Sequence, residues 1–153
     1  MNFSAIRHFA GPQGLLTNLA TMLAYFVAGH VGLLLAVPPS NASPIWPPAG
    51  IALAVLLLHG PRVLPGIFAG AFLIHITAFL DASNNETLQQ TLLVGLSTSL
   101  GSALQAWLGY FLLTRFIRPP LTLTHARAVV KFVILGGILT YLTAATIKII
   151  NLL

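Results

Sequence analysis

Apolar stretches separated by short polar or proline-rich connections run along almost the whole of this chain of 153 residues. At a helical rise of 1.5 Å per residue, four of these stretches are long enough to cross a hydrocarbon core about 30 Å thick. The pattern therefore predicts an all-α, integral membrane bundle of about five transmembrane helices. The long stretches are Leu15–Val37, Val63–Leu80, Thr91–Thr114 and Val129–Leu153, and a shorter one precedes the second of them.

The short stretch begins with Trp46-Pro47-Pro48 and ends near His59, where Gly60 and a further proline follow. Proline suits the first turn of a helix, because the N–H that it lacks would have no helical partner there. A helix from Pro47 to His59 is only about 20 Å long and does not span a bilayer core. We predict that this second helix is broken at its outer end, and that irregular chain through Trp46 is covered by other protein or lines a wet cavity.

The composition supports a membrane location. The chain is 57% hydrophobic and only 6% charged, with a mean hydropathy of +0.93, whereas soluble domains are about 25% charged. The net charge of +5 does not indicate a nucleic-acid partner, because the basic residues lie at the ends of apolar stretches rather than on one basic helix. The absence of cysteine excludes disulfides and thiolate metal sites.

The distribution of charge predicts the orientation of the helices. With a cytoplasmic N-terminus, Arg7, Arg62 and the segment Arg115–Lys131 all face the cytoplasm, as the positive-inside rule requires. The acidic loop Asp81–Gln90 then faces outside. Lys148 is an exception near the outer end of the fifth helix, where a lysine side chain reaches the interface. We expect a multi-pass protein of a bacterial inner membrane.

Three motifs resemble one known family. They are Ala42–Ala54 (ASPIWPPAGIALA), Arg62–Leu73 (RVLPGIFAGAFL) and Gly101–Gly109 (GSALQAWLG), the last followed by Arg115. In this order and spacing they resemble the bacterial membrane-associated sensor domain of the first type, of the MASE group, over about Leu15–Lys148. The Trp-Pro-Pro-Ala-Gly segment is the most distinctive part.

The resemblance implies a sensory module of about eight transmembrane helices ahead of a cytoplasmic histidine kinase, a GGDEF diguanylate cyclase or an EAL phosphodiesterase. This chain differs in having about five spans and no output domain. It also stops at Leu153 within an apolar stretch, so we expect residues 1–153 to form a single sensory domain that is part of something longer. By itself it is not expected to be an enzyme, since no nucleophile is paired with a base.

The Trp46 segment is the first candidate for ligand binding. A helix that starts within the membrane directs N–H donors and a partial positive charge at whatever lies before it. Trp46, Pro47 and Gly50 would then line a pocket for a small molecule from the outer side. In the alternative interpretation, Trp46 is an interfacial anchor and the prolines only shape a turn.

Polar side chains within apolar stretches are the other candidates. His30 and His75 lie in the outer halves of two predicted helices, where they could bind a ligand, respond to protons or, if the rings face one another, hold haem or a metal. Either ring could instead be satisfied by a backbone carbonyl or a hydroxyl. Gln105, one turn from Ser102, is either interhelical glue or a pocket residue. We expect no metal and no cofactor.

The remaining expectations concern partners and alternatives. Gly66 and Gly70 have the GxxxG spacing that lets another helix approach closely, either within the chain or in a homodimer. The expected partners are the lipid bilayer, an unknown small-molecule ligand and a cytoplasmic signalling output domain or protein. A substrate-binding membrane subunit of a transporter is the alternative function, and a structural or assembly role is a third hypothesis.

Overall fold

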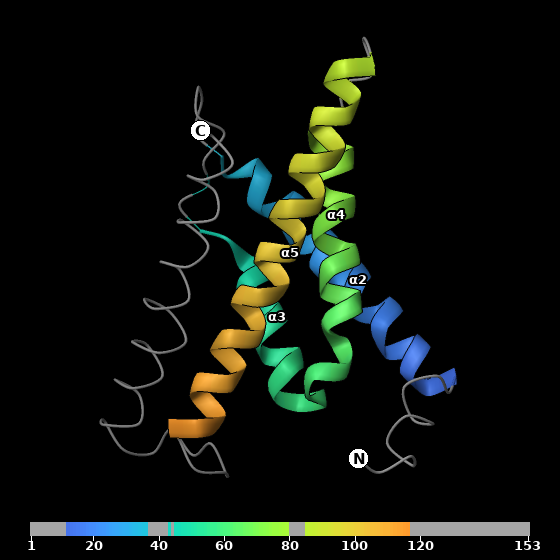
Figure 1. Cartoon of the computed structure of the whole chain (residues 1–153). Coiled ribbons are helices and arrows are strands. Elements are labelled where there is room, and N and C mark those ends of the chain that lie inside the picture. Colours follow the sequence, from blue (N-terminus) through green and yellow to red (C-terminus); the bar gives the residue numbers. More distant parts are fainter. Residues whose placement is uncertain (1–11, 37–42, 44, 80–84, 117–153) are drawn as a thin grey trace.

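The computed structural model describes residues 12–36, 43, 45–79 and 85–116, and all regular structure within these ranges is helical (Figure 1). Three helical segments are long and apolar enough to cross a membrane, and Pro47–His59 is a shorter apolar helix. The predicted all-α membrane bundle is thus confirmed, while the predicted fifth helix, Val129–Leu153, lies outside the described residues. The elements are α2 (Pro12–Leu34), α3 (Pro47–His59), η1 (Pro61–Val63), α4 (Leu64–Phe79) and α5 (Asn85–Phe116).

Helix α3 has the bounds that the prolines predict. Trp46 precedes it with non-helical dihedrals (φ −117°, ψ 83°), and Pro47 is its first residue. At the other end, Gly60 has φ 74°, a left-handed conformation that glycine adopts at little cost. The Gly60 N–H donates to the carbonyl oxygen of Leu56 at 2.8 Å, which closes the last turn.

Two other helices begin and end at residues that differ from the ends of the predicted apolar stretches. Helix α2 begins at Pro12 and ends at Leu34, three residues earlier at each end than the predicted Leu15–Val37. Helix α5 begins at Asn85, so the second half of the predicted polar loop Asp81–Gln90 is helical. At the starts of α2 and α5, backbone hydrogen bonding continues past the apolar stretch, so that a polar turn extends the helix. At its other end α2 stops short of Val37, because the N–H groups of Leu35 and Ala36 donate to the carbonyl oxygens three residues back, at 3.1 and 3.0 Å, in place of the α-helical pattern.

Helices α2 and α4 run in the same direction and pack closely, with α2 crossing α4 and α5 obliquely (Figure 1). A Cβ added at Gly66 would lie 2.5 Å from the Asn18 carbonyl oxygen, and one added at Gly70 would lie 2.9 Å from that of Met22. The GxxxG face therefore serves close packing within the chain, as one of the two predicted uses requires.

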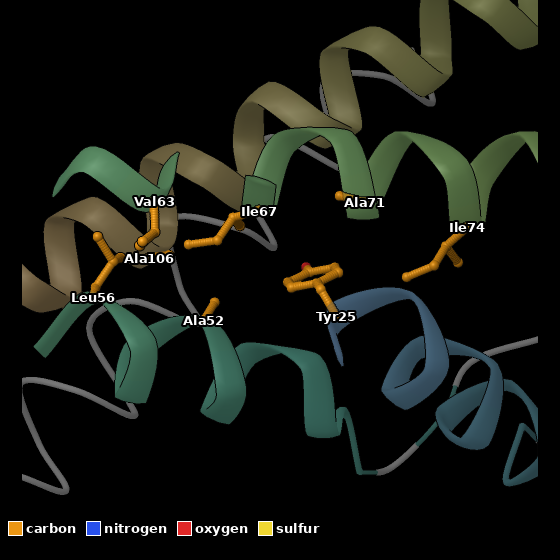
Figure 2. Close-up of a cluster of buried hydrophobic side chains, with 8 residues drawn as sticks. All are labelled: Tyr25, Ala52, Leu56, Val63, Ile67, Ala71, Ile74 and Ala106. Carbon is orange, nitrogen blue, oxygen red and sulfur yellow. The ribbon is translucent and has the colours of Figure 1, made fainter. Parts of the chain in front are cut away.

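The core lies where α2, α3, α4 and α5 meet. Figure 2 shows the Tyr25 ring of α2 between α3 and α4, among small and branched aliphatic side chains. Leucines point outwards along the same helices; Leu16 is 68% and Leu23 56% exposed. An apolar exterior around a thin core is what a bundle surrounded by lipid requires. The core residues are Tyr25, Ala52, Leu56, Val63, Ile67, Ala71, Ile74 and Ala106.

Basic residues gather at one end of the bundle. Arg62 precedes α4, and its carbonyl oxygen accepts a hydrogen bond from Asn18 near the start of α2. Helix α5 runs antiparallel to α4, because His75 near the end of α4 contacts Gly95 near the start of α5. Arg115, in the last turn of α5, therefore lies at the same end as Arg62. This arrangement agrees with the predicted orientation, in which that end faces the cytoplasm.

Candidate functional site

Trp46 and Pro47 lie against α2 at the opposite end from the arginines. A Cβ added at Gly32 would lie 3.1 Å from Cε3 of Trp46 and 3.3 Å from Cδ of Pro47, so a larger residue there would displace the two rings by a few tenths of an ångström. Trp46 is half-buried and also packs against the core. The name Trp46 corner is used below for Trp46, Pro47 and the surface of Gly32 against which these two rings pack. In this position Trp46 is packed against protein and is not only an interfacial anchor.

The start of α3 offers few hydrogen-bond donors. Pro47 and Pro48 have no N–H, and the Ala49 N–H donates to the Trp46 carbonyl oxygen at 3.2 Å. The expectation that this helix start directs free N–H groups at a ligand is therefore wrong, because the prolines that begin the helix also remove its donors. Gly50 is exposed, and a Cβ there would meet nothing within 4 Å.

Tyr25 connects the Trp46 corner with the other helices. Its side chain is 3% exposed, and Gly70 of α4 approaches it so closely that an added Cβ would lie 3.0 Å from the Tyr25 Cβ. Its phenol oxygen lies near the polar side-chain atoms of Trp46 and of Ser102 of α5. The Ser102 hydroxyl in turn donates to the Thr98 carbonyl oxygen at 3.0 Å. One buried side chain thus contacts α4, α5 and the residue before α3.

No motif in the sequence singles out Tyr25. The available signal is the row of small residues at helical spacing on its side of α2, where Ala28, Gly29 and Gly32 are also buried. A tyrosine on such a face is expected to be buried and to need a partner for its hydroxyl. That Ser102, 77 positions further along the chain, lies near this hydroxyl is not encoded in any local pattern.

His30 is satisfied within the bundle. Its Nδ1 lies 3.1 Å from the Phe26 carbonyl oxygen and must donate the proton, because a carbonyl only accepts. Its Nε2 lies 3.3 Å from the Thr77 hydroxyl oxygen of α4 and accepts when that hydroxyl turns its single proton to the ring from the Leu73 carbonyl oxygen, which is 2.8 Å away. This is the carbonyl-and-hydroxyl arrangement that the sequence left open as the alternative to a functional role. A ligand-binding or proton-responsive role of His30 stays a prediction.

His75 lies on another side of α4. Its ring Cδ2 is 2.9 Å from the position of a Cβ at Gly95 of α5, and its centroid is 5.3 Å from that of Phe79. Residues 75 and 77 point to nearly opposite sides of a helix, at about 100° per residue, and Thr77 contacts His30. The two imidazoles are therefore separated by α4 and do not face one another as a shared haem or metal would require. Within the described ranges there is no group of three or more His, Cys, Asp or Glu side chains that could hold a metal.

Gln105 lies one turn beyond Ser102 on α5, as predicted, and is half-buried beside the core residue Ala106. Whether it binds a ligand or joins helices stays a prediction.

Asn18 forms a second polar contact that the sequence did not reveal. Its Oδ1 accepts from the Gly66 N–H at 2.8 Å, and its Nδ2 donates to the carbonyl oxygens of Arg62 at 3.1 Å and Gly14 at 3.0 Å. Gly66 is in the first turn of α4, where backbone N–H groups have no helical partner. Asn18 thereby fixes α2 to the start of α4, at the end opposite the Trp46 corner.

Comparison with known proteins identifies one family. The sequence model of MASE1, the membrane-associated sensor 1 domain, matches residues 17–153, which is most of the chain. The match spans both the Trp46 corner and the α4–α5 region. No curated protein and no solved structure matches this chain.

Proposed function

The chain belongs to the MASE1 family of membrane sensor domains found in signalling proteins, and from this premise we propose that it is the ligand-input module of a bacterial signalling protein. The domain type is sensory and not catalytic. In the proposed arrangement it is a multi-pass protein of the inner membrane, with the arginine end in the cytoplasm. There it acts on an output domain or protein of the histidine kinase or cyclic-di-GMP type.

One observation carries the proposal: α3 begins inside the bundle, at Pro47, and the residue before it packs against the core. With 13 residues, α3 is about 20 Å long, which leaves about 10 Å of a hydrocarbon core that it does not fill. Non-helical backbone at such a depth needs cover from protein or from a bound molecule. We infer that a small molecule from the outer side binds at the Trp46 corner.

The surroundings of the corner favour an uncharged ligand. Prolines remove the helix-start donors that would attract an anion, and Arg62 and Arg115 lie at the opposite end of the bundle. What the corner offers is the aromatic surface of Trp46 with the Tyr25 phenol behind it. A flat or aliphatic molecule with one amide or carbonyl group matches such a surface, since an unpaired charge in this environment is costly.

Binding would produce a signal only if the ligand prefers one packing of the helices over another. A ligand shifts such an equilibrium by its difference in affinity for the two packings, and about 1.4 kcal/mol of difference changes their ratio tenfold. The Trp46 corner is a suitable place for that difference, because the start of α3 contacts both α2 and the core there.

The test uses the whole chain purified in detergent and a panel of uncharged aromatic and aliphatic amides, each with the carboxylate of the same shape. We expect some amides to raise the thermal unfolding midpoint of the wild-type chain and of Trp107→Phe, a control at the exposed tryptophan. Trp46→Phe keeps an aromatic ring but removes the N–H, and Trp46→Leu removes the ring; both should reduce the stabilisation. Equal stabilisation of the wild type and both Trp46 variants, or stabilisation by no compound, would contradict the proposal.

A further inference from the structure

The Thr77 hydroxyl of α4 has one proton and more than one acceptor around it. Its oxygen lies 2.8 Å from the Leu73 carbonyl oxygen, 3.2 Å from that of Ile74 and 3.3 Å from Nε2 of His30. The Nδ1 of His30 carries a proton, because it lies 3.1 Å from the Phe26 carbonyl oxygen. In a neutral imidazole Nε2 is then an acceptor, so a single hydroxyl proton has to serve both the ring and its own helix.

A second proton on the imidazole removes this competition. The protonated Nε2 donates to the Thr77 oxygen, while the Thr77 O–H stays on the Leu73 carbonyl oxygen. The Nδ1–H keeps the Phe26 carbonyl oxygen as its acceptor. Every donor of the ring and of the hydroxyl then has an acceptor. The bond between α2 and α4 also becomes charge-assisted, and such bonds are roughly twice as strong as neutral ones.

The contact lies near the end of the bundle opposite the arginines. His30 is one turn before Leu34, the last residue of α2, and Thr77 is in the last turn of α4, which ends at Phe79. Thr77 is exposed and His30 is half-buried. A charge costs most at the centre of a bilayer and less near the end of a helix, where water and headgroups are close. A proton can therefore reach this ring from the aqueous phase.

No other titratable side chain of the described residues contacts the pair. On α2, Tyr25 lies between α3 and α4 in the core (Figure 2). On α4, the His75 ring lies against Gly95 of α5, on another side of the helix. The carboxyl groups of Asp81 and Glu86 lie outside the part of the chain whose side chains are described. The remaining titratable groups lie toward the arginine end: His59, Arg62, Tyr110 and Arg115.

The two ends of the α2–α4 pair differ in how they respond to protons. At the arginine end, Asn18 is bonded to backbone groups of Gly14, Arg62 and Gly66, which do not titrate. At the other end, the contact between His30 and Thr77 changes with a single proton. Proton binding therefore strengthens the α2–α4 contact at one end of the bundle and leaves the other end as it is.

We propose that His30 and Thr77 form a proton-binding site whose occupation fastens the outer ends of α2 and α4 to one another. The ligand is the proton itself, so the site gives the domain a response to acidity that is separate from the small molecule proposed for the Trp46 corner. Its assignment to the outer side rests on the orientation given in the proposed function. The test needs neither that orientation nor a small molecule, so its failure is distinguishable from a failed ligand screen.

The experiment compares the thermal unfolding midpoints of the whole chain and of Thr77→Val in detergent at about pH 5 and about pH 8, between which histidine changes its charge. Valine keeps the shape of threonine and removes the hydroxyl. The extra stabilisation needs the protonated ring, so it is present at the lower pH and is lost as the pH rises. We expect Thr77→Val to lower the midpoint by about 2–4 °C more at the lower pH. The other histidines titrate in both chains and cancel in the difference.

Thr114 provides the matched control. Its hydroxyl oxygen lies 2.8 Å from the Tyr110 carbonyl oxygen and 3.2 Å from that of Phe111, the same two kinds of contact that Thr77 makes within its own helix. Thr114 is also exposed and near the end of its helix, but none of its described contacts is with an imidazole. We expect Thr114→Val to change the midpoint equally at both pH values. Thr77→Ser keeps the hydroxyl and should retain the pH dependence of the parent.

The decisive comparison repeats Thr77→Val in a His30→Gln chain, because glutamine keeps a donor and an acceptor but takes up no proton. The effect of Thr77→Val should then be the same at both pH values. Circular dichroism confirms for each variant that the helices are intact. The proposal is overturned if Thr77→Val has the same effect at both pH values in the parent, or if its pH dependence persists in the His30→Gln chain.

A second measurement covers the case in which a Thr77→Val chain does not fold. The parent and His30→Gln differ in the proton-binding ring alone, so the stability advantage of the parent should grow at the lower pH. An advantage that stays constant or shrinks there would also overturn the proposal.

Discussion

Among the described glycines, the one that lies closest to the backbone of another helix gives the most quantitative prediction. At Gly66 of α4, an added Cβ would lie 2.5 Å from the Asn18 carbonyl oxygen and 3.1 Å from its Cα. Both are atoms of the α2 backbone, so no side-chain rotation relieves the overlap. In Gly66→Ala the two helices must separate by about 1 Å to regain an ordinary van der Waals distance.

The separation affects more than packing. The Asn18 Oδ1 accepts from the N–H of Gly66 itself at 2.8 Å, and a displacement of about 1 Å stretches this contact beyond hydrogen-bonding distance. Overpacking costs about 1–3 kcal/mol and a hydrogen bond between membrane helices contributes about 0.6–1.7 kcal/mol. The higher helix propensity of alanine offsets about 1 kcal/mol. We expect Gly66→Ala to lower the free energy of unfolding by about 1–3 kcal/mol.

The assay is reversible unfolding of the purified chain in mixed micelles, followed by circular dichroism as the share of denaturing detergent rises. Gly50→Ala is the matched control, because Gly50 is also helical but an added Cβ would meet nothing within 4 Å. It should be neutral or stabilising by up to about 1 kcal/mol. Gly29→Ala should fall between the two, since its Cβ would meet the Ile74 side chain, which can move. A Gly66→Ala chain as stable as Gly50→Ala would refute the close α2–α4 contact.

Three further predictions follow from other contacts. Asn18→Ala should lower the free energy of unfolding by about 1–2 kcal/mol in the same assay, because it leaves a first-turn N–H of α4 without its acceptor; an unchanged stability would contradict this contact. A double-mutant cycle of His30→Ala and Thr77→Val should give a coupling energy of about 0.5–1 kcal/mol, and strictly additive effects would show that their 3.3 Å contact is not formed in the membrane. In single-tryptophan chains in vesicles with brominated lipids, Trp107, which is 41% exposed, should be quenched more strongly than the half-buried Trp46; the reverse order would place Trp46 outside the bundle.

Much of the architecture follows from local patterns. A helix started by Pro47 and ended before Gly60 is specified by residues within one turn of each boundary, and the structure has these bounds. The starts of α2 and α5 were less predictable, because backbone hydrogen bonding extends a helix beyond the apolar stretch. The prediction that the start of α3 directs N–H donors at a ligand was wrong, because the prolines that start the helix also remove its N–H groups.

The sequence by itself determined that this chain is a bundle of membrane helices, where the short helix lies, and which family it belongs to. These properties depend on composition, on the length of apolar stretches and on motifs of a few consecutive residues. Only the tertiary structure decided that Tyr25 lies between the Trp46 corner and Ser102, that α2 covers Gly66, and that α4 separates His30 from His75. Those contacts depend on how helices distant in sequence are rotated and aligned against one another, and in an apolar chain nearly every face is hydrophobic enough to be the buried one.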